Sequence, residues 1–297
     1  MPLIRRASHA GNWYTDNWTE LDQQLQEWLS KAEYRHGPAR AVIVPHAGYS
    51  YSGPTAGHGY RQIDPKNVKR IFILGPSHFV RVNSGCALTK TAQYETPLYN
   101  LNIDEEINKR LEATGQFERM SQDTDENEHS IEMQLPYLAK VMENYRNQFT
   151  IIPVLVGSIN SMEQYKYGDI FAPYLNDPQN LFVISSDFCH WGRRFRYTYF
   201  DKSKGEIYKS IEHLDKMGMN IIEELNAYDY EKYLNSYGNT ICGRNPIGVL
   251  LYAIQKLLNI NNGLHLELKF LKYAQSSQCR TMDDSSVSYA TASVVIQ

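Results

Sequence analysis

Long apolar runs and a strong charge of either sign are missing from this sequence of 297 residues. No uninterrupted apolar stretch approaches the roughly 20 residues that a membrane-spanning helix needs, so we expect no membrane span. The formal net charge of −3 argues against a mainly electrostatic affinity for nucleic acid. No internal repeat, low-complexity tract or linker divides the chain. We therefore expect residues 1–297 to form a single domain.

Cysteines are few, and they lie far apart in the sequence. The four cysteines are Cys86, Cys189, Cys242 and Cys279, and none forms the C-x-x-C pair of a zinc knuckle or a dithiol. The first residues, 1–6, lack the apolar core of a secretory signal, which favours the cytoplasm, with the nucleus as a second location. Disulfides are rare in those compartments, and each thiol is by default a small buried hydrophobe.

Three strand-like apolar runs end in histidine-bearing turns. Residues 41–45 precede His46, residues 70–75 precede His78, and residues 181–186 precede Asp187 and His190. Short runs rich in Ile, Val and Phe, interleaved with helical stretches, are typical of parallel strands buried on both faces. Ligands bind at the carboxyl ends of such strands. We therefore expect the imidazoles to meet at one rim and to form a metal or acid–base site.

The remaining periodicity predicts helices around a mixed sheet. Helical spacing of apolar residues is found at 19–32, 103–113, 130–145 (with Ser130 as N-cap), 164–175, 202–225 and 246–258. Further strands are expected at 150–157 and, as an antiparallel pair at a sheet edge, at 264–271 and 287–296. The predicted fold class is α/β, a three-layer sandwich on a mixed, mostly parallel sheet.

His46 and His78 each follow a strand in a turn of small residues. Gly48 lies close to His46, and Gly and Pro precede His78, so a ligand can approach the backbone closely. Either histidine alone fits a hydrogen-bonded turn residue. Two such turns on neighbouring strands are not a packing requirement, and neutral imidazole is a common metal ligand, so the pair indicates a metal. Tyr49 and Tyr51 are candidates for the wall of the same pocket.

Two acid–imidazole pairs could face the crevice. Asp187 and His190 are spaced for an acid–base pair or for a ligand with its orienting partner, and equally for a structural hydrogen bond. His129 and Glu132 lie three residues apart near a predicted helix start and so share one face. That spacing occurs in metal sites and also on ordinary surface helices.

Cys242 precedes a predicted helix. A thiol near a helix N-terminus and beside Arg244 is expected to have a lowered pKa, which suits a metal ligand or a nucleophile. A nucleophile would take His190 or His129 as its base and Asp187 as the orienting group. The remaining alternative is a buried, inert thiol.

Several of these motifs recur together in one known family. The strings are Pro45-His-Ala-Gly-Tyr49, Gly75-Pro-Ser-His78, Glu128-His-Ser-Ile-Glu132 with Leu135-Pro136, Ser185-Ser-Asp-Phe-Cys-His-Trp191, Ile241-Cys-Gly-Arg244, Tyr273-Ala-Gln-Ser-Ser-Gln-Cys279 and Ser285-Ser-Val-Ser-Tyr289. In this order they resemble the Memo family, named for "mediator of ErbB2-driven cell motility". The resemblance covers essentially the whole chain and is closest to the animal members.

The resemblance implies a fold and a set of site residues. Memo proteins share the fold of class III extradiol dioxygenases, in which two histidines and a glutamate hold Fe(II). The positions that match the Memo metal site are His46, His78 and Cys242, which implies one copper or iron ion, with zinc a weaker match. A thiolate in place of a carboxylate makes ring-cleaving activity an unexpected outcome. Asp187 and His190 match the pocket as acid–base or supporting groups, and around them we expect His129, Glu132, Tyr49 and Arg244.

Two classes of function follow from the resemblance, and they are compatible. The first is a redox metalloprotein that handles copper or iron, or a metal-dependent oxidoreductase. The second is an adaptor in receptor tyrosine kinase-linked motility signalling, with phosphorylated receptor tails, adaptor proteins and cytoskeletal regulators as partners. Its phosphate contacts would come from Arg193, Arg194, Arg196 or Arg244, although residues 193–196 also fit a solvated loop. A zinc hydrolase built on strand-end His and Asp ranks third.

Overall fold

The protein contains both helices and strands, and a computed structural model describes it at residues 3–83, 85–261 and 263–296. The α-helices are α1 (Trp18–Lys31), α2 (Tyr49–Tyr60), α3 (Glu105–Glu112), α4 (Gln122–Asn127), α5 (His129–Glu132), α6 (Leu135–Val141), α7 (Ser161–Asn176), α8 (Ile207–Glu223), α9 (Ala227–Tyr237) and α10 (Arg244–Ile260). The strands are β1 (Ile4–Arg5), β2 (Ala41–Val44), β3 (Arg70–Pro76), β4 (Cys86–Leu88), β5 (Gln93–Tyr94), β6 (Leu101–Asn102), β7 (Phe117–Arg119), β8 (Thr150–Val156), β9 (Asn180–Ser185), β10 (His190–Trp191), β11 (Leu266–Gln275) and β12 (Ser286–Ile296).

One large mixed sheet forms the centre of the described structure. Its strand order is β10-β12-β2-β9-β3-β8-β4-β7, and β11 pairs with β12. The central strands β2, β9, β3 and β8 are parallel, whereas β12 and β4 run antiparallel to their neighbours β2 and β8. The antiparallel pair β11–β12 at the sheet edge is confirmed. A small second sheet joins β1, β5 and β6.

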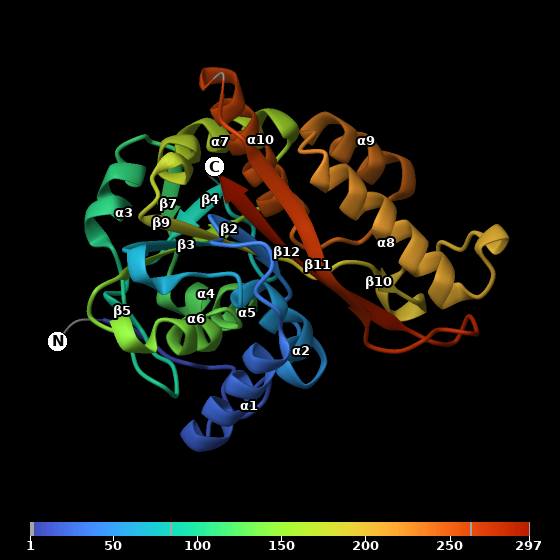
Figure 1. The fold of residues 1–297 in the computed structure, drawn as a ribbon, viewed down its shortest axis with the longest axis horizontal. Helices are drawn as coiled ribbons and strands as arrows, with labels where there is room; N and C mark the ends of the chain where they lie inside the picture. The colour runs from blue at the N-terminus through green and yellow to red at the C-terminus, as the bar shows by residue number, and fades with distance from the viewer. Residues whose placement is uncertain (1–2, 84, 262, 297) are drawn as a thin grey trace.

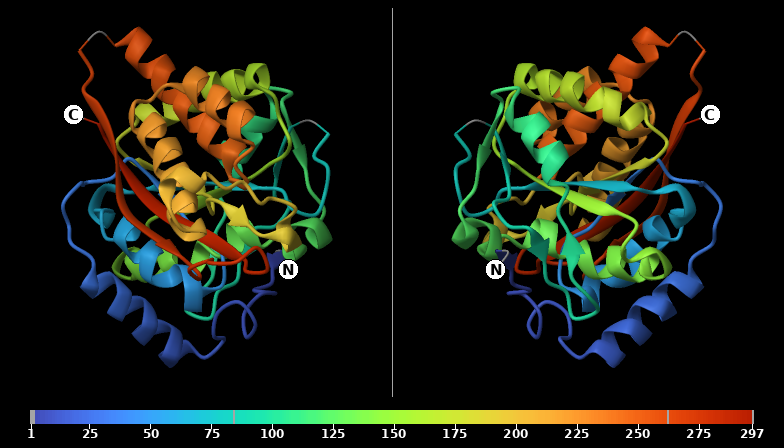
Figure 2. Two further views of the ribbon diagram at one scale, coloured as in Figure 1. Left: turned by 90° about the vertical axis from the view of Figure 1, so that its right-hand side faces the viewer. Right: turned by 90° about the vertical axis from the view of Figure 1, so that its left-hand side faces the viewer.

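The two faces of the large sheet bury alternate residues of each central strand. Ile43 and Ile184 belong to a core with α7, α8, α9 and α10, whereas Val44 and Val183 belong to a core with α1, α2 and α6. Because both faces are covered, the middle of each central strand is a continuous apolar run. Figures 1 and 2 show the sheet between these two helical layers. The predicted three-layer α/β sandwich is confirmed.

Local sequence explains where several helices begin. Asn17 caps α1 by accepting a hydrogen bond from the Glu20 backbone, and Leu21 and Leu25 form the buried stripe. Asn160 and the third residue of α7 form a reciprocal capping box. No helix of the described residues combines the length and the apolarity that crossing a bilayer requires.

Two of the predicted helices are divided. The segment 130–145 contains the short helices α5 and α6, because Pro136 lies in the first turn of α6 and suits a helix start. Ser130 as N-cap was wrong: Glu128 caps α5 by accepting from the Ser130 backbone N–H. The segment 202–225 begins with an isolated turn that ends at Gly205, whose φ of 91° belongs to the left-handed region, so α8 starts only after it.

Candidate metal centre

The turns after three neighbouring strands bring His46, Asp187 and His78 to one rim. β2, β9 and β3 are adjacent and parallel, so their carboxyl ends share one edge of the sheet. His46 follows β2, Asp187 follows β9 and His78 follows β3. The arrangement at the rim is therefore a direct consequence of strand order.

Cys242 reaches the same place from the other side of the sheet. The loop before α10 sets its Sγ 3.0 Å from His46 Nε2. Ligand atoms of His46, His78 and Cys242 all lie within 4.8 Å of one another. Around one ion with metal–nitrogen bonds of about 2.0–2.1 Å and metal–sulfur bonds of about 2.3 Å, ligand atoms are roughly 3–4 Å apart. The three donors therefore fit a single ion after small side-chain adjustments.

The tautomer of His46 is determined by a buried serine. Ser185 Oγ donates its proton to the Ser130 carbonyl (2.7 Å) and accepts from Gln134 Nε2 (2.8 Å). In the 2.7 Å contact between Ser185 Oγ and His46 Nδ1, the ring nitrogen must then be the donor. Burial and the neighbouring histidines lower the pKa of His46, so the ring is neutral. Its lone pair is consequently on Nε2, which faces the Cys242 sulfur.

Glu128 orients His78 in the same way. One carboxylate oxygen of Glu128 lies 2.9 Å from His78 Nδ1, and the other accepts from the His78 backbone N–H at 2.7 Å. Although burial opposes it, the hydrogen bonds from His78 and Ser130 lower the pKa of Glu128 to about 2, so the acid is ionised. An ionised carboxylate can only accept, so Nδ1 carries the proton and Nε2 is the donor atom left for a metal.

The Ser185–His46 contact can be tested separately. We expect Ser185→Ala to weaken metal binding about 10–100-fold, because outer partners of ligand histidines have effects of this size. Ser277→Ala is the matched control, since it removes a pocket hydroxyl that bonds to the Ser285 carbonyl. Competition titration of both variants checks the prediction. Equal affinities would contradict the assignment of Nε2 as the donor.

His129 belongs to the pocket wall and is a poor third imidazole ligand. With His78 and Glu128 it forms a second group of close donor atoms. However, the His129 and His78 rings are stacked, with centroids 4.4 Å apart and planes 25° apart. In-plane lone pairs of stacked rings run side by side and do not converge on one point. The His46 and His78 rings, at 81°, lack this conflict, so we favour the set that includes Cys242.

The environment of Cys242 differs from the sequence prediction. The Asp187 backbone N–H points at the sulfur from 3.1 Å. Burial and the charge of Asp187 raise the pKa of the thiol, so the predicted lowering was wrong for the protein without a metal. Arg244 does not compensate, because its guanidinium donates to the carbonyls of Ile241 and Asn239 and braces the loop.

Asp187 and His190 have separate partners. Asp187 Oδ1 accepts from the backbone N–H groups of His46 (2.9 Å) and Ala47 (3.3 Å), which fixes the turn after β2. His190 Nδ1 lies 3.0 Å from the Phe188 carbonyl, an acceptor, so this nitrogen is the donor. Burial raises the pKa of Asp187, and nearby His190 opposes the rise. Asp187 thus supports the loop of one candidate ligand.

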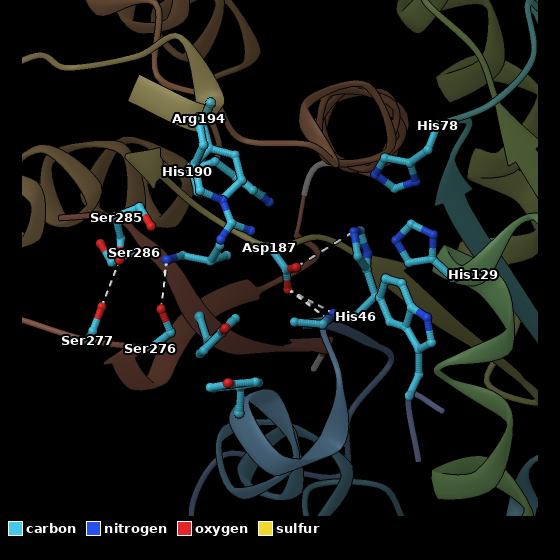
Figure 3. A pocket seen from close by; sticks show the side chains of 16 residues that line it. His46, His78, His129, Asp187, His190, Arg194, Ser276, Ser277, Ser285 and Ser286 are labelled. Atoms are coloured by element: carbon cyan, nitrogen blue, oxygen red, sulfur yellow. Dashed lines mark hydrogen bonds and ion pairs between the residues drawn. The ribbon is translucent and has the colours of Figure 1, made fainter. Parts of the chain in front are cut away.

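A cavity of about 560 Å³ opens beside the centre. His46, His78 and His129 lie on one side of it, and His190, Arg194 and the serines lie on the other (Figure 3). The lining residues are Trp13, His46, Ala47, Tyr51, His78, His129, Asp187, His190, Arg194, Phe195, Ser276, Ser277, Ser285, Ser286, Val287 and Tyr289. Such a mixed wall suits a small ligand next to a metal.

Three residues predicted around the pocket lie elsewhere. Tyr49 is buried and donates to the Met133 carbonyl, so Tyr51 alone of that pair lines the cavity. Glu132 is not among the lining residues, because its buried carboxylate is bound to Arg5, His9 and Tyr14. Arg244 lies in the loop behind Cys242 and is not among the lining residues.

The sequence analysis did not predict four residues that support or line the site: Ser185, Glu128, Gln134 and Trp13. Ser185 ends β9 only two residues before Asp187, and Glu128 is next to His129. Their neighbours in the sequence could have drawn attention to them. Gln134 and Trp13 carried no comparable signal, since their partners are more than 50 residues away in the chain.

The fold and the donors define an α/β protein with a candidate His₂Cys centre at its strand ends. A family model described as "Memo-like protein" matches residues 5–293. The chain is 58% identical to human "Protein MEMO1" and 57% identical to the zebrafish (Danio rerio) protein of that name, each over 294 residues, 99% of this chain and 98% of the relative. It is 52% identical to "Protein memo-1 homolog" of Caenorhabditis elegans over 288 residues, 97% of this chain and 81% of the relative. The chain belongs to the Memo family.

Proposed function

We propose that this protein binds one copper or iron ion through His46, His78 and Cys242. The observation that carries the proposal is the 3.0 Å approach of Cys242 Sγ to His46 Nε2, the nitrogen that carries the ring's lone pair because Nδ1 donates to Ser185. Two imidazoles and one thiolate are borderline to soft donors, which suits Cu(I) and Fe(II) better than Mg²⁺ or Ca²⁺. Zinc is the weaker alternative.

The metal and the pocket residues would then have separate roles. A bound copper or iron ion supplies one-electron redox chemistry. His190, with Nδ1 tied to a carbonyl, offers its other nitrogen to the cavity for proton transfer. The Trp13 ring packs against the His129 ring, with centroids 4.4 Å and planes 33° apart. In cells the role we propose is cytoplasmic metal or redox homeostasis linked to receptor tyrosine kinase motility signalling.

Metal binding is expected to depend on pH. The Cys242 thiol must lose its proton to bind, and its pKa is raised by burial and by Asp187. Between about pH 7 and 8.5 the apparent affinity should therefore rise about tenfold per pH unit. In Cys242→His the ligand is a buried, neutral imidazole that releases no proton on binding, so the slope should fall toward zero. Competition titration across this range measures both slopes, and a flat wild-type profile would contradict thiol displacement.

The direct test is an anaerobic titration of Cu(I) and Fe(II) against competing chelators. We expect one equivalent of metal per chain, with the tighter ion identifying the cofactor. His78→Ala should lose the binding, whereas His58→Ala, which removes a half-buried histidine on α2, should keep it. A folded wild-type protein that binds neither ion would overturn the proposal.

A second candidate function is supported by Arg194. This exposed side chain lines the cavity beside His190, across from His46 and His78, and lies over the Phe195 ring at 4.5 Å. Within the described residues it has no carboxylate partner, whereas Arg193 pairs with Asp283. A cation beside serine hydroxyls and aromatic rings suits a phosphotyrosine peptide from a receptor tail.

Peptide binding can be separated from metal binding with two variants. We expect Arg194→Ala to weaken a phosphotyrosine peptide about tenfold or more, because it removes a charge-assisted hydrogen bond. Arg193→Ala is the control and should have little effect, since its partner Asp283 is exposed. Calorimetry with phosphorylated and unphosphorylated peptides measures both. Equal binding of the two peptides would exclude the adaptor function at this pocket.

A further inference from the structure

One further buried carboxylate lies behind the candidate metal centre, and in the described part of the chain no positive side chain pairs with it. Asp215 on α8 is completely buried. Burial raises the pKa of Asp215 to about 6, and hydrogen bonds oppose the rise. A buried carboxylate without a counter-charge is costly, and an apolar side chain in the same core would avoid the cost. We therefore expect Asp215 to have a specific role, and its hydrogen-bond partners identify that role.

Asp215 joins the two loops that carry the candidate residues. Oδ1 accepts from the Cys189 backbone N–H (3.2 Å), one residue before His190. The same oxygen accepts from Asn239 Nδ2 (2.9 Å), at the start of the loop that carries Cys242. Oδ2 accepts from Tyr273 OH (2.9 Å) on β11, which lies alongside α8 (Figure 1).

The two loops are also tied to each other beyond Asp215. Thr240 Oγ accepts from the His190 backbone N–H at 2.7 Å and lies 2.9 Å from the His190 carbonyl. One step further, the Asp187 N–H reaches the Cys242 sulfur at 3.1 Å. Asp215 is thus the first member of a series of hydrogen bonds between the two loops, and the last member is the Cys242 sulfur that faces His46.

We propose that Asp215 is a positioning residue that holds the Cys242 loop against the turn after β9 and so sets the place of the sulfur. The inference rests on the proposed metal function for its effect on affinity. The placement of the thiol itself is independent of any metal. Asp215 touches neither the cavity nor a donor atom, so it acts only through Asn239 and Cys189.

Asp215→Leu and Asp215→Asn separate this role from core packing. Leucine fills the space and accepts no hydrogen bond. Asparagine keeps the Oδ1 acceptor, and its amide faces Tyr273, whose hydroxyl can donate to Ser288 Oγ at 3.1 Å instead. We expect Asp215→Leu to weaken Cu(I) binding about 10–100-fold, the range for outer partners of ligands, and Asp215→Asn to stay within about threefold of wild type.

A second readout needs no metal. In the metal-free protein, iodoacetamide labelling of Cys242, followed by peptide mass spectrometry, reports how firmly the loop is held. We expect labelling at least about tenfold faster in Asp215→Leu and unchanged in Asp215→Asn. Asn239→Ala should behave like Asp215→Leu. Tyr273→Phe removes a donor that is not on either loop and should behave like wild type.

The outcomes distinguish the two proposals. Leu25→Ala, which removes a fully buried side chain on the remote helix α1, should lower Tm without changing labelling or affinity. If wild type binds no metal but the labelling pattern holds, the metal function fails and the positioning role stands. If wild type binds metal and the Asp215 and Asn239 variants match it in both readouts, the positioning role is wrong. If Asp215→Leu does not fold, Asn239→Ala against Tyr273→Phe decides in the same way.

Discussion

Cys242→Ser is expected to lower the affinity for Cu(I) or Fe(II) at least about a hundredfold. Structural zinc sites with four ligands bind with about 10–16 kcal/mol, so one ligand contributes roughly 3 kcal/mol, which is more than a hundredfold in affinity. Serine keeps the size of the side chain, but its neutral hydroxyl is a weak ligand for a soft ion. His46 and His78 alone would then hold the metal. Competition titration against a calibrated chelator measures the loss.

A matched cysteine makes this prediction specific. Cys86 on β4 is completely buried and lies outside the cavity lining. Cys86→Ser should change stability without changing metal affinity. Equal affinities of the Cys242→Ser variant and the wild type would show that the Cys242 thiolate is not a metal ligand.

Arg5→Met is expected to destabilise the fold by about 3–5 kcal/mol. Arg5 is completely buried, and its guanidinium contacts Asp125 (3.0 Å) and Glu132 (2.7 Å). Methionine fits the space but leaves Asp125 without its cation and Glu132 with only His9 as a basic partner. In the variant the pKa of each folded-state carboxyl rises, so stability lost at neutral pH should partly return as the pH falls toward about 4. Urea unfolding at both pH values measures the effect.

Two comparisons show whether the loss comes from the buried charge. Arg110→Met removes an exposed ion pair with Glu106 and should cost only about 0.3–0.5 kcal/mol. Combining Arg5→Met with Glu132→Gln should cost less than the sum of the two single changes, by about 0.5–3 kcal/mol. Additive losses would mean that Arg5 acts through packing alone.

The strand ends could be predicted from the sequence because their causes are local. Buried parallel strands have continuous apolar runs, and 41–45, 70–75 and 181–186 show them clearly. Strand order then places His46, Asp187 and His78 at one edge. Cys242 was already a candidate ligand or nucleophile, and the family resemblance assigned it to the same site as His46, although its place depends on a loop nearly 200 residues from His46.

The wrong predictions about the site concern the direction of side chains and the effect of burial on a pKa. Glu132 shares a short helix with His129, but α5 ends there and the carboxylate binds Arg5 in the core. Tyr49 follows His46 by three residues and nevertheless points into the core. The pKa of Cys242 was predicted from helix and arginine charges, whereas burial and Asp187 decide its direction. Such effects depend on contacts that spacing does not encode.

The most direct test of the metal centre is an anaerobic Co(II) titration followed by absorption. Cobalt(II) takes the place of Fe(II) and gives an intense near-ultraviolet band only when a thiolate is bound. We expect this band to saturate at one equivalent in wild type and to be absent in Cys242→Ser. A folded wild-type protein with no such band, or a band that survives in Cys242→Ser, would contradict a centre built from His46, His78 and Cys242.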